Sequence, residues 1–209
     1  MLSTLKHRFR LMRGKAKAQR LAQSKHEIWL NLGAGRVRGR DGWTTVDWNK
    51  RCDVYWDLTC KLPFPNDRVS RIYTSHTLEH LTFGETQSLL RECHRILRVG
   101  GELSVCVPNA RFYIDAYIEG REIDTSKVYA PAWNFLSPID VVNYTAYMNG
   151  EHKHLFDQDN LVAVLAKAGF ADSAAREFDD QTDIKSRDYA SIYASASKQK
   201  LSDPLRKAA

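Results

Sequence analysis

The segment His76-Thr77-Leu78-Glu79-His80 holds three side chains that can exchange protons. His76, Glu79 and His80 have the spacing i, i+3 and i+4, so they share one face if this segment turns helically. A neutral imidazole near pH 7 can take a proton from a hydroxyl group. We therefore expect a general base or acid among these three residues, and His154, in the Glu-His-Lys-His segment at 151–154, is a fourth candidate.

A glycine turn at Gly33-Ala34-Gly35 follows an apolar run and can bind a small molecule, because backbone without large side chains lets a ligand approach closely. A phosphate-binding P-loop needs Lys-Ser or Lys-Thr after its last glycine, and Gly39-Arg40-Asp41 has neither. The spacing G-x-G-x-x-x-G also departs from the dinucleotide fingerprint G-x-G-x-x-G. The turn therefore favours a nucleoside without a pyrophosphate.

Two aspartates end the next two apolar runs. Asp47 can accept hydrogen bonds from both ribose hydroxyls, and Asp57 can accept one from an adenine amino group while the Leu58 backbone meets the ring edge. Each residue alone also fits a turn or a strand end. Their order after successive runs favours one nucleoside site.

The elements that must position these residues alternate between strands and helices. A helical pattern covers 85–98 and another covers 157–170, and the last two strand-like runs can pair antiparallel. The strand-like runs are EIWLNL, WTTVDW, DVYWDL, RIYTS, GELSVCVP, FADSAAREF and YASIYASAS. This order predicts an open α/β sheet with a ligand site at the carboxyl ends of its strands.

The first crossovers are shorter than such a sheet usually needs. About one helical turn fits between the first two runs, and only Trp48 to Cys52 separates the second from the third. We therefore expect short or irregular second and third strands.

An irregular, aromatic segment spans 108–150, and its place after the fifth strand suits a lid over the predicted ligand site. Aromatic faces pack against sugar rings and nucleobases alike, although at least half of these side chains are expected to form a small core. The eight aromatics are Phe112, Tyr113, Tyr117, Tyr129, Trp133, Phe135, Tyr144 and Tyr147.

The first 26 residues carry eight Lys or Arg and no acid, which accounts for the formal net charge of +6. We expect a basic helix in 1–26, a catalytic domain over 27–197 and a flexible tail at 198–209. The helix can cover the cofactor, lie in solvent, or contact an anionic membrane or polymer.

The chain of 209 residues, 43% hydrophobic, fits one globular domain with an appendage. Its four cysteines lack the spacing of a disulfide framework, so reduced thiols are expected. There is no run of about 18 apolar residues, and residues 1–20 lack a signal-peptide pattern. We expect a cytoplasmic protein without a transmembrane segment.

The chain resembles class I S-adenosylmethionine-dependent methyltransferases over Ile28 to Ser197. More narrowly, it is similar to small type-11-like methyltransferases associated with cell-surface polysaccharide synthesis. The resemblance rests on the ordered segments LNLGAG, VDWN, WDLTCKLPFPNDRVSRIYTSHTLEHL, RILRVGGELSVCVPN and HLFDQDNLVAVLAKAGF. It implies a Rossmann-like sheet of seven strands, mostly parallel, with strand 7 antiparallel.

The resemblance also implies roles for individual residues. Gly33, Ala34 and Gly35 would line the methionine and sulfonium end of S-adenosylmethionine, and Ser75 with His76 would face its reactive end. Asp47 would hold the ribose, and Asp57 with Leu58 would hold the adenine. Arg36, Arg38 and Arg40 offer nothing to a cationic sulfonium and fit either a solvated loop or a phosphate on a substrate.

The segment at 76–80 is also similar to the E-x-x-E-H segment of small-RNA 2′-O-methyltransferases and ubiquinone-pathway O-methyltransferases, which bind a divalent metal there. Such a metal would lower the pKa of the acceptor hydroxyl, with further ligands from 151–154. H-x-x-E-H also occurs in the middle of a helix in inverted zinc peptidases, but here it follows a strand. Because L-E-H is common in methyltransferases without a known metal, general-base catalysis is favoured and the metal stays an alternative.

These observations predict an S-adenosylmethionine-dependent methyltransferase that O-methylates a sugar or another small hydroxyl acceptor, including glycans. Two alternatives stay open: a nucleic-acid methyltransferase that uses the basic N-terminus, and a non-catalytic nucleoside-binding module. Salt-sensitive binding through residues 1–26 would favour the first alternative.

Overall fold

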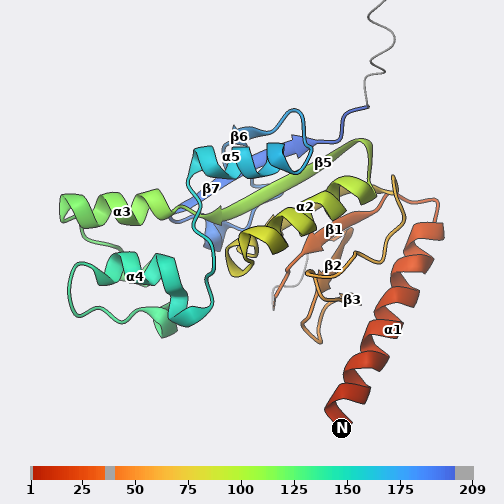
Figure 1. Cartoon of the computed structure of the whole chain (residues 1–209), viewed down its shortest axis with the longest axis horizontal. Helices are drawn as coiled ribbons and strands as arrows, with labels where there is room; N and C mark the ends of the chain where they lie inside the picture. The colour runs from red at the N-terminus through yellow and green to blue at the C-terminus, as the bar shows by residue number, and fades with distance from the viewer. Residues whose placement is uncertain (1, 36–40, 201–209) are drawn as a thin grey trace, which may run out of the picture.

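The computed structural model describes residues 2–35 and 41–200, and a seven-stranded sheet lies at its centre (Figure 1). The strand order is β3-β2-β1-β4-β5-β7-β6. Neighbours from β3 to β5 pair parallel, and β7 runs antiparallel to β5 and β6. The strands are β1 (Trp29–Leu32), β2 (Trp43–Asp47), β3 (Val54–Tyr55), β4 (Val69–Ser75), β5 (Leu97–Pro108), β6 (Ala174–Arg176) and β7 (Ser191–Ser197). The predicted mostly parallel sheet with an antiparallel strand 7 is confirmed.

The short first crossovers are confirmed as well. β2 and β3 pair parallel through Val46 with Val54 and Asp47 with Tyr55, although only residues 48–53 connect them. The Asp53 carboxylate helps to hold this tight connection, because it accepts hydrogen bonds from Thr45 N at 3.1 Å and Thr45 Oγ1 at 2.8 Å. With this short connection, β3 has only two residues.

The N-terminal helix α1 (Leu2–Gln23) packs along the edge strand β3 (Figure 1). Gly14 meets the Tyr55 backbone, Ala18 is fully buried in the main core, and Lys17 pairs with Asp53 at 2.9 Å. A helix therefore forms within 1–26 as expected. It covers the β3 edge of the sheet, where the described residues between β1 and β3 form no helix.

Helices α2 (Phe83–Ile96) and α5 (Gln158–Lys167) pack side by side on the sheet. Gln87 Nε2 on α2 donates a hydrogen bond to Val164 O on α5 at 2.9 Å. A capping box starts α2, since Thr82 and Glu85 bond reciprocally. The predicted helix at 85–98 begins and ends two residues earlier than expected, because the chain becomes extended at Leu97 and enters β5 there.

The segment 108–150 is not irregular as predicted, because it contains two α-helices. α3 (Ala110–Glu119) and α4 (Asp140–Tyr147) pack together, and α3 ends where Gly120 adopts the left-handed conformation. The described residues also form five short 3-10 helices, three of them in this segment: η1 (Leu78–His80), η2 (Thr125–Lys127), η3 (Ala130–Ala132), η4 (Met148–Gly150) and η5 (Lys185–Arg187). Helices form here because residues at helical spacing are buried between α3 and α4. Tyr113 and Ala116 of α3 share one buried cluster with Tyr144 of α4.

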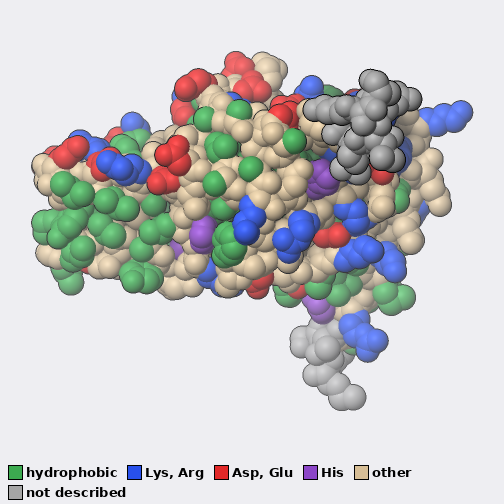
Figure 2. Space-filling model, turned by 45° about the horizontal axis from the view of Figure 1, so that its top comes forward, with side chains coloured by type: hydrophobic (Ala, Val, Ile, Leu, Met, Phe, Trp, Pro, Cys, Tyr) green, Lys and Arg blue, Asp and Glu red, His purple; other side chains and the backbone are tan. Residues whose placement is uncertain are grey.

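This insertion has a small core separate from that of the sheet, formed by Tyr113, Ala116, Ala132, Val141 and Tyr144. It lies beyond the end of β5, at the left of Figure 1. Figure 2 shows hydrophobic side chains gathered at that end of the molecule. The exposed ones in the insertion are Tyr117, Ile118, Tyr129, Phe135, Leu136, Ile139 and Tyr147.

The structure also bears on the state of the cysteines and on membrane-crossing helices. The four cysteines are free, as their spacing predicts. Among the helices in the described part of the chain, none combines the length and the apolar character that crossing a membrane requires.

Candidate active site

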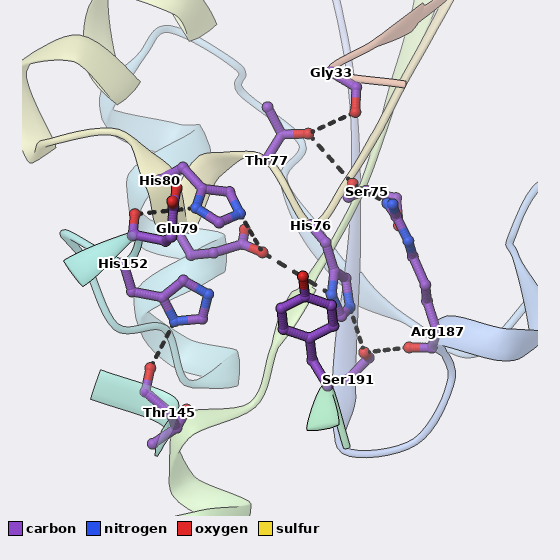
Figure 3. A network of polar contacts seen from close by, with 12 residues as sticks. Gly33, Ser75, His76, Thr77, Glu79, His80, Thr145, His152, Arg187 and Ser191 are labelled. Atoms are coloured by element: carbon purple, nitrogen blue, oxygen red, sulfur yellow. Dashed lines mark hydrogen bonds and ion pairs between the residues drawn. The ribbon is translucent and has the colours of Figure 1, made fainter. Parts of the chain in front are cut away.

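The end of β4 brings His76 and Glu79 to one side of a cavity (Figure 3). His76 has a left-handed φ of 50°, which turns the chain sharply out of the strand, and its N–H donates to Cys106 O on β5 at 2.9 Å. The 3-10 helix η1 then places Glu79 Oε1 4.0 Å from His76 Nδ1 and 3.9 Å from His80 Nε2. The predicted convergence of these three side chains is therefore present.

The cavity measures about 680 Å³ and lies between the end of β4 and the insertion. Its polar wall comes from His76, Glu79, His80, His152 and Arg187. Its opposite wall comes from the insertion and the chain before β7, namely Tyr113, Lys127, Val128, Tyr129, Pro131, Ala132, Tyr144, Met148 and Tyr189. Aromatic rings thus face a cluster of ionisable side chains across a space large enough for a small ligand.

A chain of hydrogen bonds fixes the proton on His76. Ser191 Oγ donates to the carbonyl oxygen of Arg187 at 2.5 Å, because a carbonyl can only accept. Ser191 must then accept from His76 Nε2, which lies 2.9 Å away. The lone pair of a neutral His76 is consequently on Nδ1, the nitrogen that faces Glu79.

The same reasoning orients His80 and His152. His80 Nδ1 donates to the carbonyl of Glu151 at 3.0 Å, and His152 Nδ1 donates to the carbonyl of Thr145 at 2.7 Å. Both rings therefore keep the lone pair on Nε2. The two rings meet edge to face with centroids 5.0 Å apart (Figure 3).

The electrostatics of the cluster follow from its burial. The Glu79 side chain is 3% exposed, and removal from water raises its pKa to about 8. Burial also lowers the pKa of His76, with the positive charge of Arg187 as a further cause, although 27% of the His76 side chain remains exposed. Burial lowers the pKa of His152 as well. Burial therefore favours neutral imidazoles at His76 and His152 and a protonated carboxyl at Glu79 near pH 7.

The residues of this cluster fit a divalent metal ion. One ligand atom each from Glu79, His80 and His152 lie within 4.8 Å of one another. Both imidazoles donate Nδ1–H to a backbone carbonyl, which is the usual support of a metal-binding histidine. Glu79 Oε2 is buried, and no described residue gives it a hydrogen bond.

His154 does not join this cluster. Its Nε2 lies 3.3 Å from Asn160 Oδ1, its ring contacts Phe156 and Phe83, and it is not among the residues that line the cavity. The Glu-His-Lys-His segment does contribute a histidine, but that histidine is His152. His152, rather than His154, is therefore the candidate catalytic or metal-binding residue of this segment.

The glycine turn after β1 lies against the same segment. Gly33 has φ +71°, and a Cβ there would lie 2.1 Å from Thr77 Oγ1, so only glycine fits beside the turn that follows β4. Gly35 has φ +61° and open space where its Cβ would be. Ala34 is buried between them. Thr77 thus occupies the space beside Gly33, whereas the backbone at Gly35 is open, and the expected ligand contact at this turn stays a prediction.

Asp47 holds the glycine turn in place. Its carboxylate accepts from Gly35 N at 2.8 Å and from Asn49 N at 2.6 Å. Both carboxylate oxygens of Asp47 therefore already accept a backbone hydrogen bond. The expected ribose contact would use their remaining lone pairs. Arg36, Arg38 and Arg40, the basic residues of this loop, lie outside the described residues.

Asp57 and Leu58 follow β3 and lie near Asp47, since Trp56 N donates to Asp47 O at 3.0 Å. Asp57 Oδ1 accepts from Thr59 N at 2.9 Å and Thr59 Oγ1 at 2.8 Å, which makes a local turn. Ser75 is buried at the end of β4, and its carbonyl accepts from Arg187 Nη1 at 2.5 Å. The expected cofactor residues therefore gather at the carboxyl ends of β1 to β4.

Two residues of this site have no signal in the sequence. Arg187 and Ser191 lie more than 100 positions after His76, and β7 brings them to it by pairing with β5. His152 has a weak signal, because it stands in the Glu-His-Lys-His segment.

Residues 44–105 match the family described as a methyltransferase domain. No curated protein matches the sequence. The matched part runs from β2 to β5 and includes Asp47, Asp57, His76 and Glu79.

Solved structures share the fold at low sequence identity. The apo form of the S-adenosylmethionine-dependent methyltransferase SibL is 15% identical with a TM-score of 0.51, over 86% of this chain and 53% of that one. A SAM-dependent methyltransferase from Archaeoglobus fulgidus is 15% identical with a TM-score of 0.50, over 88% of this chain and 92% of that one. The chain spans 56% of a structure from Nostoc punctiforme, at 14% identity and a TM-score of 0.49.

Proposed function

We propose that the chain is a class I S-adenosylmethionine-dependent methyltransferase and that it methylates a hydroxyl group of a sugar or of another small acceptor. The match of residues 44–105 to a methyltransferase domain and the shared fold support the first part of this proposal. The observation that carries this proposal is the cavity of about 680 Å³ in which His76, Glu79, His80 and His152 face the aromatic residues of the insertion. A ring-shaped polar acceptor can stack on Tyr129, Tyr144 or Tyr189 while one hydroxyl reaches the histidines.

S-adenosylmethionine, when bound, supplies the methyl group, and the residues of this chain position it. The turn Gly33-Ala34-Gly35 would line its methionine end, with open space at Gly35. Asp47 would accept from the ribose, and Asp57 with Leu58 would meet the adenine. Ser75 and His76 face the reactive end, where the acceptor cavity begins. An in-line approach of the acceptor oxygen is the main requirement of methyl transfer.

The acceptor proton leaves toward the cluster. His76 Nδ1 offers a lone pair inside the cavity, and its Nε2 proton is held by Ser191. A histidine with a lowered pKa is a weak base, so the acceptor hydroxyl needs activation beyond His76 alone. A divalent cation held by Glu79, His80 and His152 would lower the pKa of that hydroxyl.

Calorimetry tests the cofactor part of this proposal. We expect the wild type to bind S-adenosylmethionine and S-adenosylhomocysteine, and Asp47→Asn to weaken both by about tenfold or more through loss of a charged acceptor. Glu102→Gln, a substitution of an exposed acid on β5, should leave both affinities unchanged. Absence of binding to the folded wild type would overturn the proposal.

An acceptor screen tests the reaction. S-adenosylhomocysteine release is measured with sugars, sugar nucleotides and oligosaccharides, with Mg²⁺, Mn²⁺, Co²⁺ or Zn²⁺ and with a chelator. His152→Ala should lose metal binding and about 100-fold of turnover, whereas His154→Ala should retain both. Methylation of oligonucleotides but of no sugar would favour the nucleic-acid alternative, and binding without turnover of any acceptor would favour the non-catalytic module.

A further inference from the structure

Helix α1 exposes three large apolar side chains on one face. Leu5, Phe9 and Met12 are 68%, 58% and 69% exposed, and their spacing i, i+4 and i+7 places them in one stripe. At about 100° per residue this stripe is nearly opposite the face of Gly14 and Ala18, which packs on the sheet. The stripe therefore has no role in holding α1 to the protein.

Basic side chains border the stripe on both sides. The same helical geometry places Arg8 and Lys15 along one border and Arg13 and Arg20 along the other. α1 has seven Lys or Arg and no acid. Within the described part of the chain, Lys17 is the one base of α1 that forms an ion pair, with Asp53. Most of this charge is thus available to an external partner.

A basic cleft continues the charge from α1 toward β3. It measures about 610 Å³, and its walls include Arg10, Arg13, Lys17, Arg20 and Lys50. Figure 2 shows Lys and Arg side chains gathered on the half of the molecule that carries α1. The positive surface therefore lies along the α1 edge of the molecule, away from the insertion.

We propose that α1 docks the protein on the surface of an anionic lipid bilayer. Leu5, Phe9 and Met12 enter the boundary between headgroups and acyl chains, and the flanking bases contact the lipid phosphates. A nucleic acid would use the bases but would leave three apolar side chains against phosphates, so the stripe favours the bilayer. This proposal concerns binding alone and does not depend on the acceptor or on turnover.

Vesicle sedimentation with the full chain tests it. The wild type should bind vesicles of phosphatidylcholine with 30% phosphatidylglycerol about tenfold or more better than vesicles of pure phosphatidylcholine. Leu5→Ser, Phe9→Ser and Met12→Ser together should remove about tenfold or more of the binding to anionic vesicles. Phe9→Trp alone should retain binding, because Trp favours the membrane interface. Circular dichroism checks that α1 stays folded in each variant.

A matched triple variant provides the control. Ile118→Ser, Leu136→Ser and Ile139→Ser remove exposed apolar side chains from the insertion and should leave vesicle binding unchanged. Loss of binding in this variant alone would assign the membrane contact to the insertion and overturn the proposal. Binding of the wild type to an RNA or DNA duplex that persists in the Leu5, Phe9 and Met12 variant, without binding to anionic vesicles, would overturn it in favour of a nucleic acid.

Discussion

Single residues decide which proton sits where in this site. Three imidazoles each have one nitrogen fixed by a hydrogen bond, to Glu151 O, Thr145 O or Ser191 Oγ. The other nitrogen of each ring keeps its lone pair and faces Glu79 or the cavity. Glu79 Oε2 is buried and receives no hydrogen bond from the described residues, so the charge state of this carboxyl determines the electrostatics of the cluster.

Glu79 should make the metal-free protein less stable as the pH rises. Below its ordinary pKa of 4.5 the carboxyl is protonated in both the folded and the unfolded chain, and up to about 8 only the unfolded chain ionises. The free energy of unfolding then falls by at most about 1.4 kcal/mol per pH unit in this window. Glu79→Gln removes this dependence, because an amide resembles the protonated acid and does not titrate.

The measurement is urea unfolding between pH 5 and 9 with a chelator present. The difference in unfolding free energy between Glu79→Gln and the wild type should grow with pH. Glu102→Gln, at an exposed position, should follow the wild-type curve. Parallel curves for Glu79→Gln and the wild type would show that the carboxyl is not held protonated by burial.

At the scale of elements, α1 covers the edge of the sheet beside the short strand β3. β3 has two residues at the edge of the sheet, and α1 covers it through Gly14 and Ala18. Close contact at Gly14 is the condition for this packing, since a Cβ there would lie 2.4 Å from Tyr55 O. The helix is thus part of the domain, although its charge alone suggests a loose appendage.

Gly14→Ala should therefore destabilise the protein, although the same change in a helix usually stabilises. A glycine in a helix interior costs about 1 kcal/mol relative to alanine, but overlap with a backbone oxygen costs about 1–3 kcal/mol and forces α1 away from β3. Gly84→Ala on α2 is the matched control, since its Cβ would meet nothing within 4 Å, and it should be neutral or stabilising. Thermal unfolding measures both, and equal effects of the two substitutions would contradict the packing of α1.

The sequence indicates some elements and not others, for physical reasons. The buried strands β1, β4 and β5 and the capped helices α2 and α5 carry strong local patterns, and they form where expected. The helices α3 and α4 are harder to predict from the sequence, because their buried residues pack against each other in a separate small core rather than on the sheet. At the site, His76, Glu79 and His80 are neighbours in sequence and could be predicted, whereas Arg187 and Ser191 reach them only through the pairing of β5 with β7.

Across the whole molecule, two cores of different size lie on opposite sides of the cavity. The main core carries His76 and Glu79 at the end of β4, and the small core of the insertion carries Tyr129 and Tyr144 on the opposite wall. The insertion is held by few buried side chains, so its local stability should differ from that of the sheet.

Hydrogen exchange should show that the insertion opens without unfolding of the sheet, because few buried side chains hold it. Tyr144→Phe removes the phenol oxygen that accepts from Tyr129 N at 2.8 Å, and it should speed amide exchange in 120–150 by about fivefold, as expected for about 1 kcal/mol. Tyr147→Phe, at an exposed ring on the same helix, should change little. Faster exchange in β4 and β5 as well would mean that the insertion and the sheet unfold as one unit, and a ligand would then have to enter a cavity that stays open in the folded state.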